Sequence, residues 1–139
     1  MIVLDCSAAM GIVRQTEDGK CIKAFFTPRE KVITTDLYYI EIVSALSKYV
    51  KTGEESLEKG MHRLRAAIAL IDEFVPMEEY YTDALRESAR LNHSAYDMLY
   101  LLLASRKNAT LATLDRKLIA LCEQQGIDCV HISDTPEVE

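Results

Sequence analysis

Four carboxylates in this 139-residue sequence stand at places where acidic side chains can carry out chemistry. Asp5 directly follows the apolar stretch 2–4, and Asp115 closes the stretch 109–114. Glu41 and Asp97 each lie in the first turns of an expected helix. When helices connect parallel strands, the helix N-termini and the strand C-termini share one edge of the sheet. The sequence therefore predicts that the four acids meet at the C-terminal edge of the strands.

Local structure offers a second explanation for three of these acids. Asp5 and Asp115 each precede an expected helix, and aspartate is a favoured N-cap that contributes about 1 kcal/mol. Ser94 and Asp97 have the spacing of a capping box. Glu41 lies too far inside its helix to cap it, and no Lys or Arg stands three or four residues away. Capping and chemistry both stay open for the aspartates, whereas capping does not explain Glu41.

A cluster of four carboxylates without a counter-charge costs free energy. Two charges about 4 Å apart repel by roughly 4 kcal/mol at an effective dielectric of about 20, which exceeds the contribution of a cap. Protons or a cation must offset this repulsion, and a divalent metal does so best. Oxygen ligands favour Mg²⁺ or Mn²⁺ over zinc. Such a site suits phosphodiester hydrolysis, because a bound metal lowers the pKa of an attacking water.

Strands and helices that alternate along the chain must position these acids. Strands are expected at 2–4, 31–34, 73–75, 109–114 and 128–132, and a turn at the Asp-Gly pair of 17–20. Helices are expected from residue 6 onward and at 21–27, 37–50, 55–71, 78–90, 91–104 and 118–125. The alternation predicts an α/β fold, a mostly parallel sheet with helices on both faces. We expect one domain over residues 1–132 and a polar tail over 133–139.

Two of the expected helices carry apolar faces. In the helix at 37–50 the face consists of Tyr39, Val43, Leu46 and Val50. In the helix at 55–71 it consists of Leu57, Met61, Leu64, Ile68 and Ile71.

The composition excludes several classes of protein. With 49% hydrophobic and 27% charged residues, the chain is globular rather than disordered. No apolar run reaches roughly 18 residues, and the N-terminus lacks the features of a signal peptide, so we expect a cytoplasmic protein without a membrane span. The net charge of −6 argues against non-specific nucleic-acid binding over the whole surface, but a local basic rim or a bound cation still permits a nucleic-acid substrate. The four cysteines have no metal-ligand spacing and are expected to be small apolar fillers.

Four segments together give the chain a resemblance to a known family. They are Ile2-Val-Leu-Asp-x-Ser-Ala-Ala9, Asp36-Leu-x-x-x-Glu-x-x-x-Ala-Leu46, Ala95-Tyr-Asp-x-x-Tyr-x-x-x-Ala104 and Leu111-x-Thr-x-Asp-x-x-Leu118. Over nearly its whole length the chain resembles the PIN-domain ribonucleases, most closely the VapC-like toxins of bacterial and archaeal toxin–antitoxin pairs.

The resemblance implies a three-layer α/β/α sandwich and an endoribonuclease that depends on Mg²⁺ or Mn²⁺. It implies that Asp5, Glu41, Asp97 and Asp115 bind the metal and that the hydroxyls of Ser7 and Thr113 support the site. It also implies a homodimer, and inhibition by a small antitoxin whose tail packs into an apolar groove and reaches the acids. From the residues alone, Ser7 is equally a helix cap and Thr113 an ordinary strand residue.

The chain departs from the family pattern directly after the fourth acid. Many relatives carry an additional acid there, whereas this sequence has Arg116 and Lys117. This difference argues against a firmly held second metal and supplies two cations that can meet RNA phosphates. An ordinary solvated helix face explains these two cations equally well. Arg14 is a third candidate for RNA contact, but an ordinary surface position is the better explanation for it.

Other functions remain to be weighed against a nuclease. A haloacid-dehalogenase-like phosphatase needs a second Asp at position 7, where this chain has Ser7. A receiver-type signalling domain needs paired acids after the first strand and a Lys after the last, where this chain has Cys6 and His131. The serious alternative is a PIN-like module that binds RNA or protein with little turnover.

Overall fold

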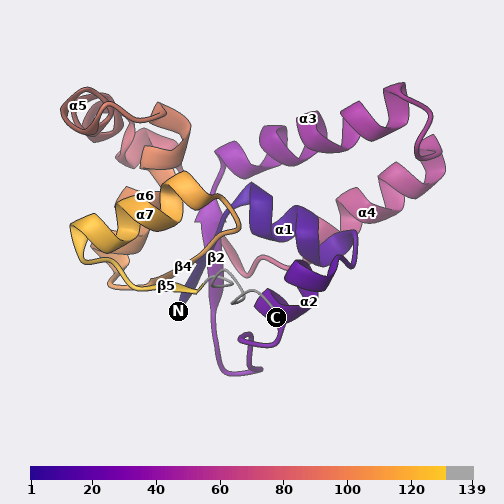
Figure 1. Ribbon diagram of the computed structural model, residues 1–139, viewed down its shortest axis with the longest axis horizontal. Coiled ribbons are helices and arrows are strands. Elements are labelled where there is room, and N and C mark those ends of the chain that lie inside the picture. The colour runs from indigo at the N-terminus through magenta and orange to yellow at the C-terminus, as the bar shows by residue number, and fades with distance from the viewer. Residues whose placement is uncertain (131–139) are drawn as a thin grey trace, which may run out of the picture.

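A parallel five-stranded sheet forms the centre of the protein, whose computed structural model describes residues 1–130 (Figure 1). The strands lie in the order β3-β2-β1-β4-β5, so β1 is central. Ile2 of β1 is paired with Val32 of β2 on one side and with Thr110 of β4 on the other. The strands are β1 (Ile2–Leu4), β2 (Val32–Thr35), β3 (Glu73–Val75), β4 (Thr110–Ala112) and β5 (Cys129–Val130).

Helices cover both faces of this sheet and give the three-layer α/β/α fold that the sequence predicts. One core cluster joins the sheet to α5, α6 and α7, and a second joins it to α1, α2, α3 and α4. Figure 1 shows these two groups of helices as separate lobes on either side of the strands. The helices are α1 (Cys6–Val13), α2 (Glu17–Lys23), α3 (Leu37–Lys51), α4 (Leu57–Ala69), the 3₁₀ turn η1 (Met77–Glu79), α5 (Tyr81–Leu91), α6 (Ala95–Lys107) and α7 (Arg116–Gln125).

The turn predicted at residues 17–20 is wrong, because these residues form the start of α2. The hydroxyl of Thr16 caps the helix by accepting a hydrogen bond from the Gly19 N–H at 3.0 Å. A Cβ at Gly19 would lie 2.0 Å from the carbonyl carbon and oxygen of Gly11 in α1. The glycine is therefore required by the close crossing of two helices and not by a turn.

The apolar faces of α3 and α4 are only partly buried. The core side of α3 consists of Leu37, Tyr38, Ile42 and Leu46, whereas Tyr39 and Val43 are 45% and 43% exposed. On α4, Leu57 and Met61 are likewise exposed. Val43, Leu57 and Met61 line a groove of about 180 Å³ between the two helices, which we call the α3–α4 groove, whereas the Tyr39 ring stacks on Phe74. Its apolar lining consists of Val43, Leu46, Val50, Leu57, Met61 and Leu64.

Several element ends differ from the sequence-based expectation by a few residues. The helix expected at 78–90 is a 3₁₀ turn followed by α5, and α7 begins at Arg116 instead of at residue 118. The last strand is described as far as Val130, so its expected continuation to 132 and the tail lie outside the described residues. Cys122 is a buried filler as expected, whereas Cys21 is exposed. Within residues 1–130, no helix is long and apolar enough to span a bilayer.

Candidate active site

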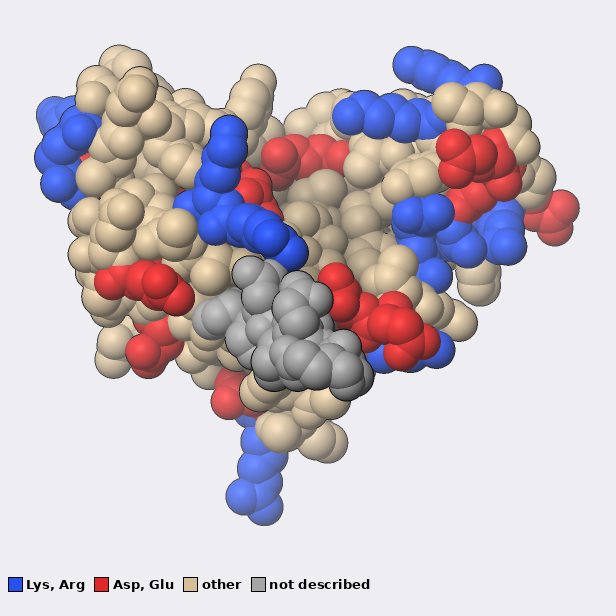
Figure 2. Space-filling model, viewed as in Figure 1, with Lys and Arg blue, Asp and Glu red and all other residues tan. Residues whose placement is uncertain are grey.

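Asp5 lies where the order of the strands reverses. The chain proceeds from β1 to β2 and β3 on one side of the sheet, then crosses to β4 and β5 on the other. In such sheets the crevice at the carboxyl ends of the two strands flanking the reversal is the preferred ligand site. Asp5 follows β1 and Thr113 follows β4, so both stand at this crevice. Figure 2 shows a hollow between the two lobes, with acidic side chains inside it and basic side chains on both sides.

Three donors fix the orientation of the Asp5 carboxylate. Its Oδ1 accepts hydrogen bonds from the Ala8 N–H at 2.9 Å and from the Ser7 hydroxyl at 2.8 Å. Its Oδ2 accepts from the Thr113 hydroxyl at 2.5 Å. The two oxygens thus cap α1 and bind both hydroxyls that the resemblance assigns to the site. Capping and support of the site are combined in one side chain and are not alternatives.

Burial makes the Asp5 carboxyl a weak acid. The residue is only 4% exposed. Loss of water raises its pKa to about 7 from the ordinary value of 3.8, although its three hydrogen bonds lower the pKa and Asp97 nearby raises it further. A cation that approaches this carboxyl would favour its ionised form and lower its pKa again.

Glu41 reaches the same crevice from α3 and is held by α6. The phenol of Tyr100, which is buried, donates a hydrogen bond of 2.5 Å to Glu41 Oε1. Burial raises the pKa of Glu41, the Tyr100 hydrogen bond lowers it, and Asp97 raises it. Tyr100 therefore joins two helices from opposite faces of the sheet through one carboxylate.

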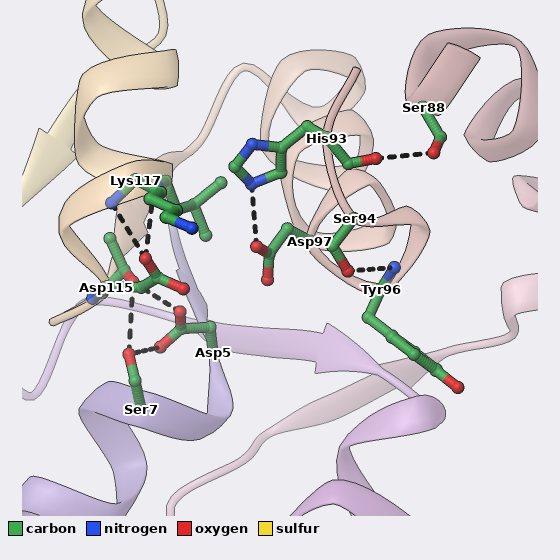
Figure 3. Close-up of polar contacts among 11 residues, drawn as sticks. Asp5, Ser7, Ser88, His93, Ser94, Tyr96, Asp97, Asp115 and Lys117 are labelled. Atoms are coloured by element: carbon green, nitrogen blue, oxygen red, sulfur yellow. Dashed lines mark hydrogen bonds and ion pairs between the residues drawn. The ribbon is translucent and has the colours of Figure 1, made fainter. Parts of the chain in front are cut away.

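Asp97 lies in the first turn of α6, which Ser94 caps by accepting from the Tyr96 N–H at 3.2 Å. The Asp97 side chain is not used for capping: its Oδ2 lies 2.9 Å from Nε2 of His93 (Figure 3). Burial raises the pKa of Asp97, His93 lowers it, and the charge of Asp115 raises it. The capping box predicted from the sequence is thus present only in its Ser94 half within the described residues.

Asp115 is the N-cap of α7. Its Oδ1 accepts hydrogen bonds from the N–H groups of Lys117 at 2.9 Å and Leu118 at 3.3 Å. The Asp115 N–H in turn donates to the Thr113 hydroxyl at 3.0 Å. Thr113 therefore connects the backbone of Asp115 to the carboxylate of Asp5.

The structure brings the four predicted acids together around Asp97. Asp97 raises the pKa of both Asp5 and Glu41, and Asp115 raises the pKa of Asp97. The Lys and Arg ion pairs described within residues 1–130 are formed with other acids, namely Glu17, Glu55, Glu73, Asp83 and Glu87. Within this part of the chain, the imidazole of His93 lies 2.9 Å from Asp97 Oδ2 and forms an ion pair with the cluster when it is protonated.

The donor set fits Mg²⁺ or Mn²⁺. Within the described residues, no three His, Cys, Asp or Glu side chains converge closely enough to form a complete protein cage. Mg²⁺ does not require such a cage, because it keeps several waters and binds through one or two carboxylates. A divalent cation would offset the mutual repulsion of the carboxylates in this cluster.

The predicted cations differ in where they lie. Arg116 and Lys117 are exposed in the first turn of α7, beside Asp115. Arg14 lies at the far end of α1 from Asp5, where its guanidinium donates to the Tyr49 hydroxyl at 2.7 Å and its Nε is 3.9 Å from Glu55. Arg116 and Lys117 thus lie beside one of the acids, whereas Arg14 links the end of α1 to α3 and to the segment between α3 and α4.

Two residues of the site were not identified from the sequence. The sequence indicates Tyr100 only as part of the motif over residues 95–104 and does not single out His93. Position supplies a signal for His93, because it stands four residues before Asp97 and an i, i+4 pair can meet on one helix face. Tyr100 contacts Glu41 across 59 positions of sequence, so local spacing does not reveal it.

The fold and the site define an α/β protein with a cluster of acidic side chains at the strand-order reversal. The family model for the PIN domain matches residues 2–135, and the chain belongs to this family. PIN domains are generally nucleases. No curated protein matches the chain by sequence.

Solved structures share this fold. PAE2754 from Pyrobaculum aerophilum has a TM-score of 0.66 and 25% identity, with 86% of this chain and 84% of that chain covered. The Mycobacterium tuberculosis toxin VapC20, which cleaves the sarcin-ricin loop, has a TM-score of 0.67 and 15% identity, with 95% and 100% covered. VapBC-1 from nontypeable Haemophilus influenzae has a TM-score of 0.64 and 14% identity, with 94% and 98% covered.

Proposed function

We propose that this protein is a metal-dependent endoribonuclease and the toxin of a type II toxin–antitoxin pair. The observation that carries the proposal is the convergence of Asp5, Glu41 and Asp115 on Asp97, at the crevice between β1 and β4. A protein of a generally nucleolytic family with such a cluster is equipped for hydrolysis of phosphodiesters.

The carboxylates take the role of metal ligands in this proposal. PIN nucleases generally use divalent metal ions. When bound, Mg²⁺ or Mn²⁺ supplies a water of lowered pKa and offsets the charge that develops on the phosphate. Ser7 and Thr113 hold the Asp5 carboxylate in one orientation, and Tyr100 does the same for Glu41. Such fixed orientation lowers the cost of assembling the site around a substrate.

The basic residues beside the site favour an RNA substrate over a small anionic one. Arg116 and Lys117 are exposed next to Asp115, where phosphates flanking the scissile bond can meet them. Their charge opposes the net charge of −6 at the place where a polyanion must approach. We place this activity in the cytoplasm, where its RNA substrate is found.

A small antitoxin protein is the proposed partner. One of the similar structures is named VapBC-1. The α3–α4 groove offers an apolar surface to a partner segment, since Leu57 is 66% exposed and Met61 is 44% exposed at its rim. Helix-in-groove binding uses such a surface. A homodimer is a further expectation from the family resemblance.

Cleavage of RNA by the purified protein tests this function. We expect single-stranded and structured RNAs to be cut with Mg²⁺ or Mn²⁺ and to stay intact with a chelator. Asp5→Ala and Asp97→Asn should abolish cutting, because each removes a carboxylate from the cluster. Asp18→Asn, which removes an exposed acid from α2, is the matched control and should cut like the parent protein.

Two results would contradict the proposal. Cleavage that persists both with a chelator and in the two site variants would show that the carboxylates do not act through a metal. Metal binding by the parent protein without cleavage of any RNA would favour the alternative, a PIN-like module that binds RNA or protein.

A further inference from the structure

The orientation of the Asp97 side chain needs an explanation, because this residue interacts electrostatically with each of the other three acids. Its charge raises the pKa of Asp5 and of Glu41, and the charge of Asp115 raises the pKa of Asp97. Repulsion from neighbouring acids favours rotation of a carboxylate toward solvent. The Asp97 side chain is nevertheless only 22% exposed, so something holds it in the crevice.

His93 is the group that holds it. Its Nε2 lies 2.9 Å from Asp97 Oδ2 and is the one hydrogen-bond partner of the Asp97 side chain within residues 1–130. An ionised carboxylate only accepts hydrogen bonds, so Nε2 carries the proton and donates. This bond occupies Oδ2 and leaves Oδ1 for another ligand.

The backbone of His93 is itself fixed. The Ser88 hydroxyl donates a 2.6 Å hydrogen bond to the His93 carbonyl, and the His93 N–H donates to the Ser88 carbonyl at 3.2 Å. Asn92 before it adopts a left-handed conformation that ends α5 and also donates to Ser88. The imidazole is 13% exposed. Figure 3 shows the resulting chain of contacts from Ser88 through His93 to Asp97, which points toward Asp115 and Asp5.

We propose that His93 is a positioning residue that holds the Asp97 carboxylate among the other acids and thereby sets the affinity of the site for a divalent cation. This inference rests on the proposed function, because it assigns a metal to the cluster. Hydrogen-bonded partners of metal ligands typically change metal affinity about 10–100-fold when they are removed.

Binding of Mn²⁺ to the metal-free protein, with no RNA present, tests this role through the electron paramagnetic resonance signal of the free ion. His93→Phe keeps a planar ring but removes the donor, and we expect Mn²⁺ to bind about 10–100-fold more weakly. His93→Gln keeps an N–H donor and should stay within about threefold of the parent protein. His62→Phe changes an exposed histidine of α4 and serves as the matched control with unchanged affinity.

A second variant covers the case in which His93→Phe fails to fold. Ser88→Ala removes the hydroxyl that fixes the His93 carbonyl but leaves both Asp97 and the imidazole in place. We expect it to weaken Mn²⁺ binding less than His93→Phe, and thermal unfolding of each metal-free variant reports whether it is folded. At saturating Mn²⁺, RNA cleavage by both variants should return toward the parent rate, because positioning acts through metal affinity.

The outcomes separate this inference from the proposed function. Parent-like Mn²⁺ affinity in folded His93→Phe would overturn the role of His93 and leave the nuclease proposal intact. Equal weakening in His93→Phe and His93→Gln would overturn it as well, because ring packing and not the hydrogen bond would then matter. A parent protein that binds no Mn²⁺ would contradict the proposed function, and this inference with it.

Discussion

Asp5 and Asp115 occupy equivalent places in two strand–helix units and have different surroundings. Each follows a strand of the parallel sheet and caps the next helix, Asp5 for α1 and Asp115 for α7. Asp5 is 4% exposed and binds two hydroxyls in addition to the helix N–H, and its pKa is raised to about 7. The Asp115 carboxylate accepts hydrogen bonds from two backbone N–H groups of its own helix.

The difference follows from where each strand lies. β1 has a strand on both sides, and Asp5 extends directly from it. Asp115 stands three residues beyond the end of β4, because Thr113 and Leu114 intervene. The intervening Thr113 is buried and directs its hydroxyl to Asp5. Asp5 is therefore enclosed by the segment that leads from β4 to Asp115. The same strand–Asp–helix arrangement thus gives a buried carboxylate at Asp5 and a helix cap at Asp115.

Among substitutions that test the difference between Asp5 and Asp115, Asp5→Asn should have the largest effect, a loss of RNA cleavage. The amide keeps the size of the side chain and can still accept from Ala8 and bond Thr113, so the fold should persist. It removes the charge that a metal requires, and we expect the cleavage rate to fall by about 10²-fold or more. Asp115→Asn should lower the cleavage rate less, because the carboxylate of Asp115 is less enclosed than that of Asp5. Equal losses in single-turnover cleavage assays would contradict the difference between the two.

The second expected effect is on stability as a function of pH in the metal-free protein. The folded pKa of Asp5, about 7, exceeds the ordinary value of 3.8, so the folded state binds more protons between these values. Stability is then greatest below about pH 4 with respect to this group and falls as pH rises toward 7. At about 1.4 kcal/mol per pKa unit, the whole contribution is on the order of 4 kcal/mol.

Asp5→Asn is the variant that isolates this contribution. Chemical denaturation of the metal-free proteins should show that Asp5→Asn is more stable than the parent at pH 8 and no more stable at pH 3.5. A parent protein and Asp5→Asn with parallel stability curves over this range would mean that the Asp5 carboxylate is not desolvated.

The sequence predicts the parts of the site that depend on order along the chain. Asp5 and Asp115 follow strands, and the alternation of strands and helices is enough to place them at one edge. Burial is not predictable in this way: the hydroxyl of Thr113 reaches Asp5 across 108 positions, and Tyr100 reaches Glu41 across 59. Such contacts depend on how strands and helices pack, which a single sequence does not state.

The fold was predicted better than the faces of its helices. Alternation gave the three-layer sandwich, but Tyr39 and Val43 are exposed in a helix that buries Tyr38 and Ile42. Both sets are apolar and lie on adjoining faces, so periodicity alone does not distinguish the core from the α3–α4 groove. In α2, the Asp-Gly pair predicted a turn. Gly19 instead allows close contact with the backbone of Gly11 in another helix, and a single sequence does not reveal that contact.

The smallest expected effect is the cost of removing the cap at Asp115. Asp115→Ala should lower the free energy of unfolding by about 1 kcal/mol, because the N–H groups of Lys117 and Leu118 lose their acceptor. Asp115→Ser keeps a capping oxygen and should retain most of this stability, yet it removes the carboxylate from the cluster. Denaturation and RNA cleavage measured on the same samples then separate the two roles of Asp115. If Asp115→Ser is both as stable and as active as the parent protein, Asp115 is a cap alone, and the acidic site consists of Asp5, Glu41 and Asp97.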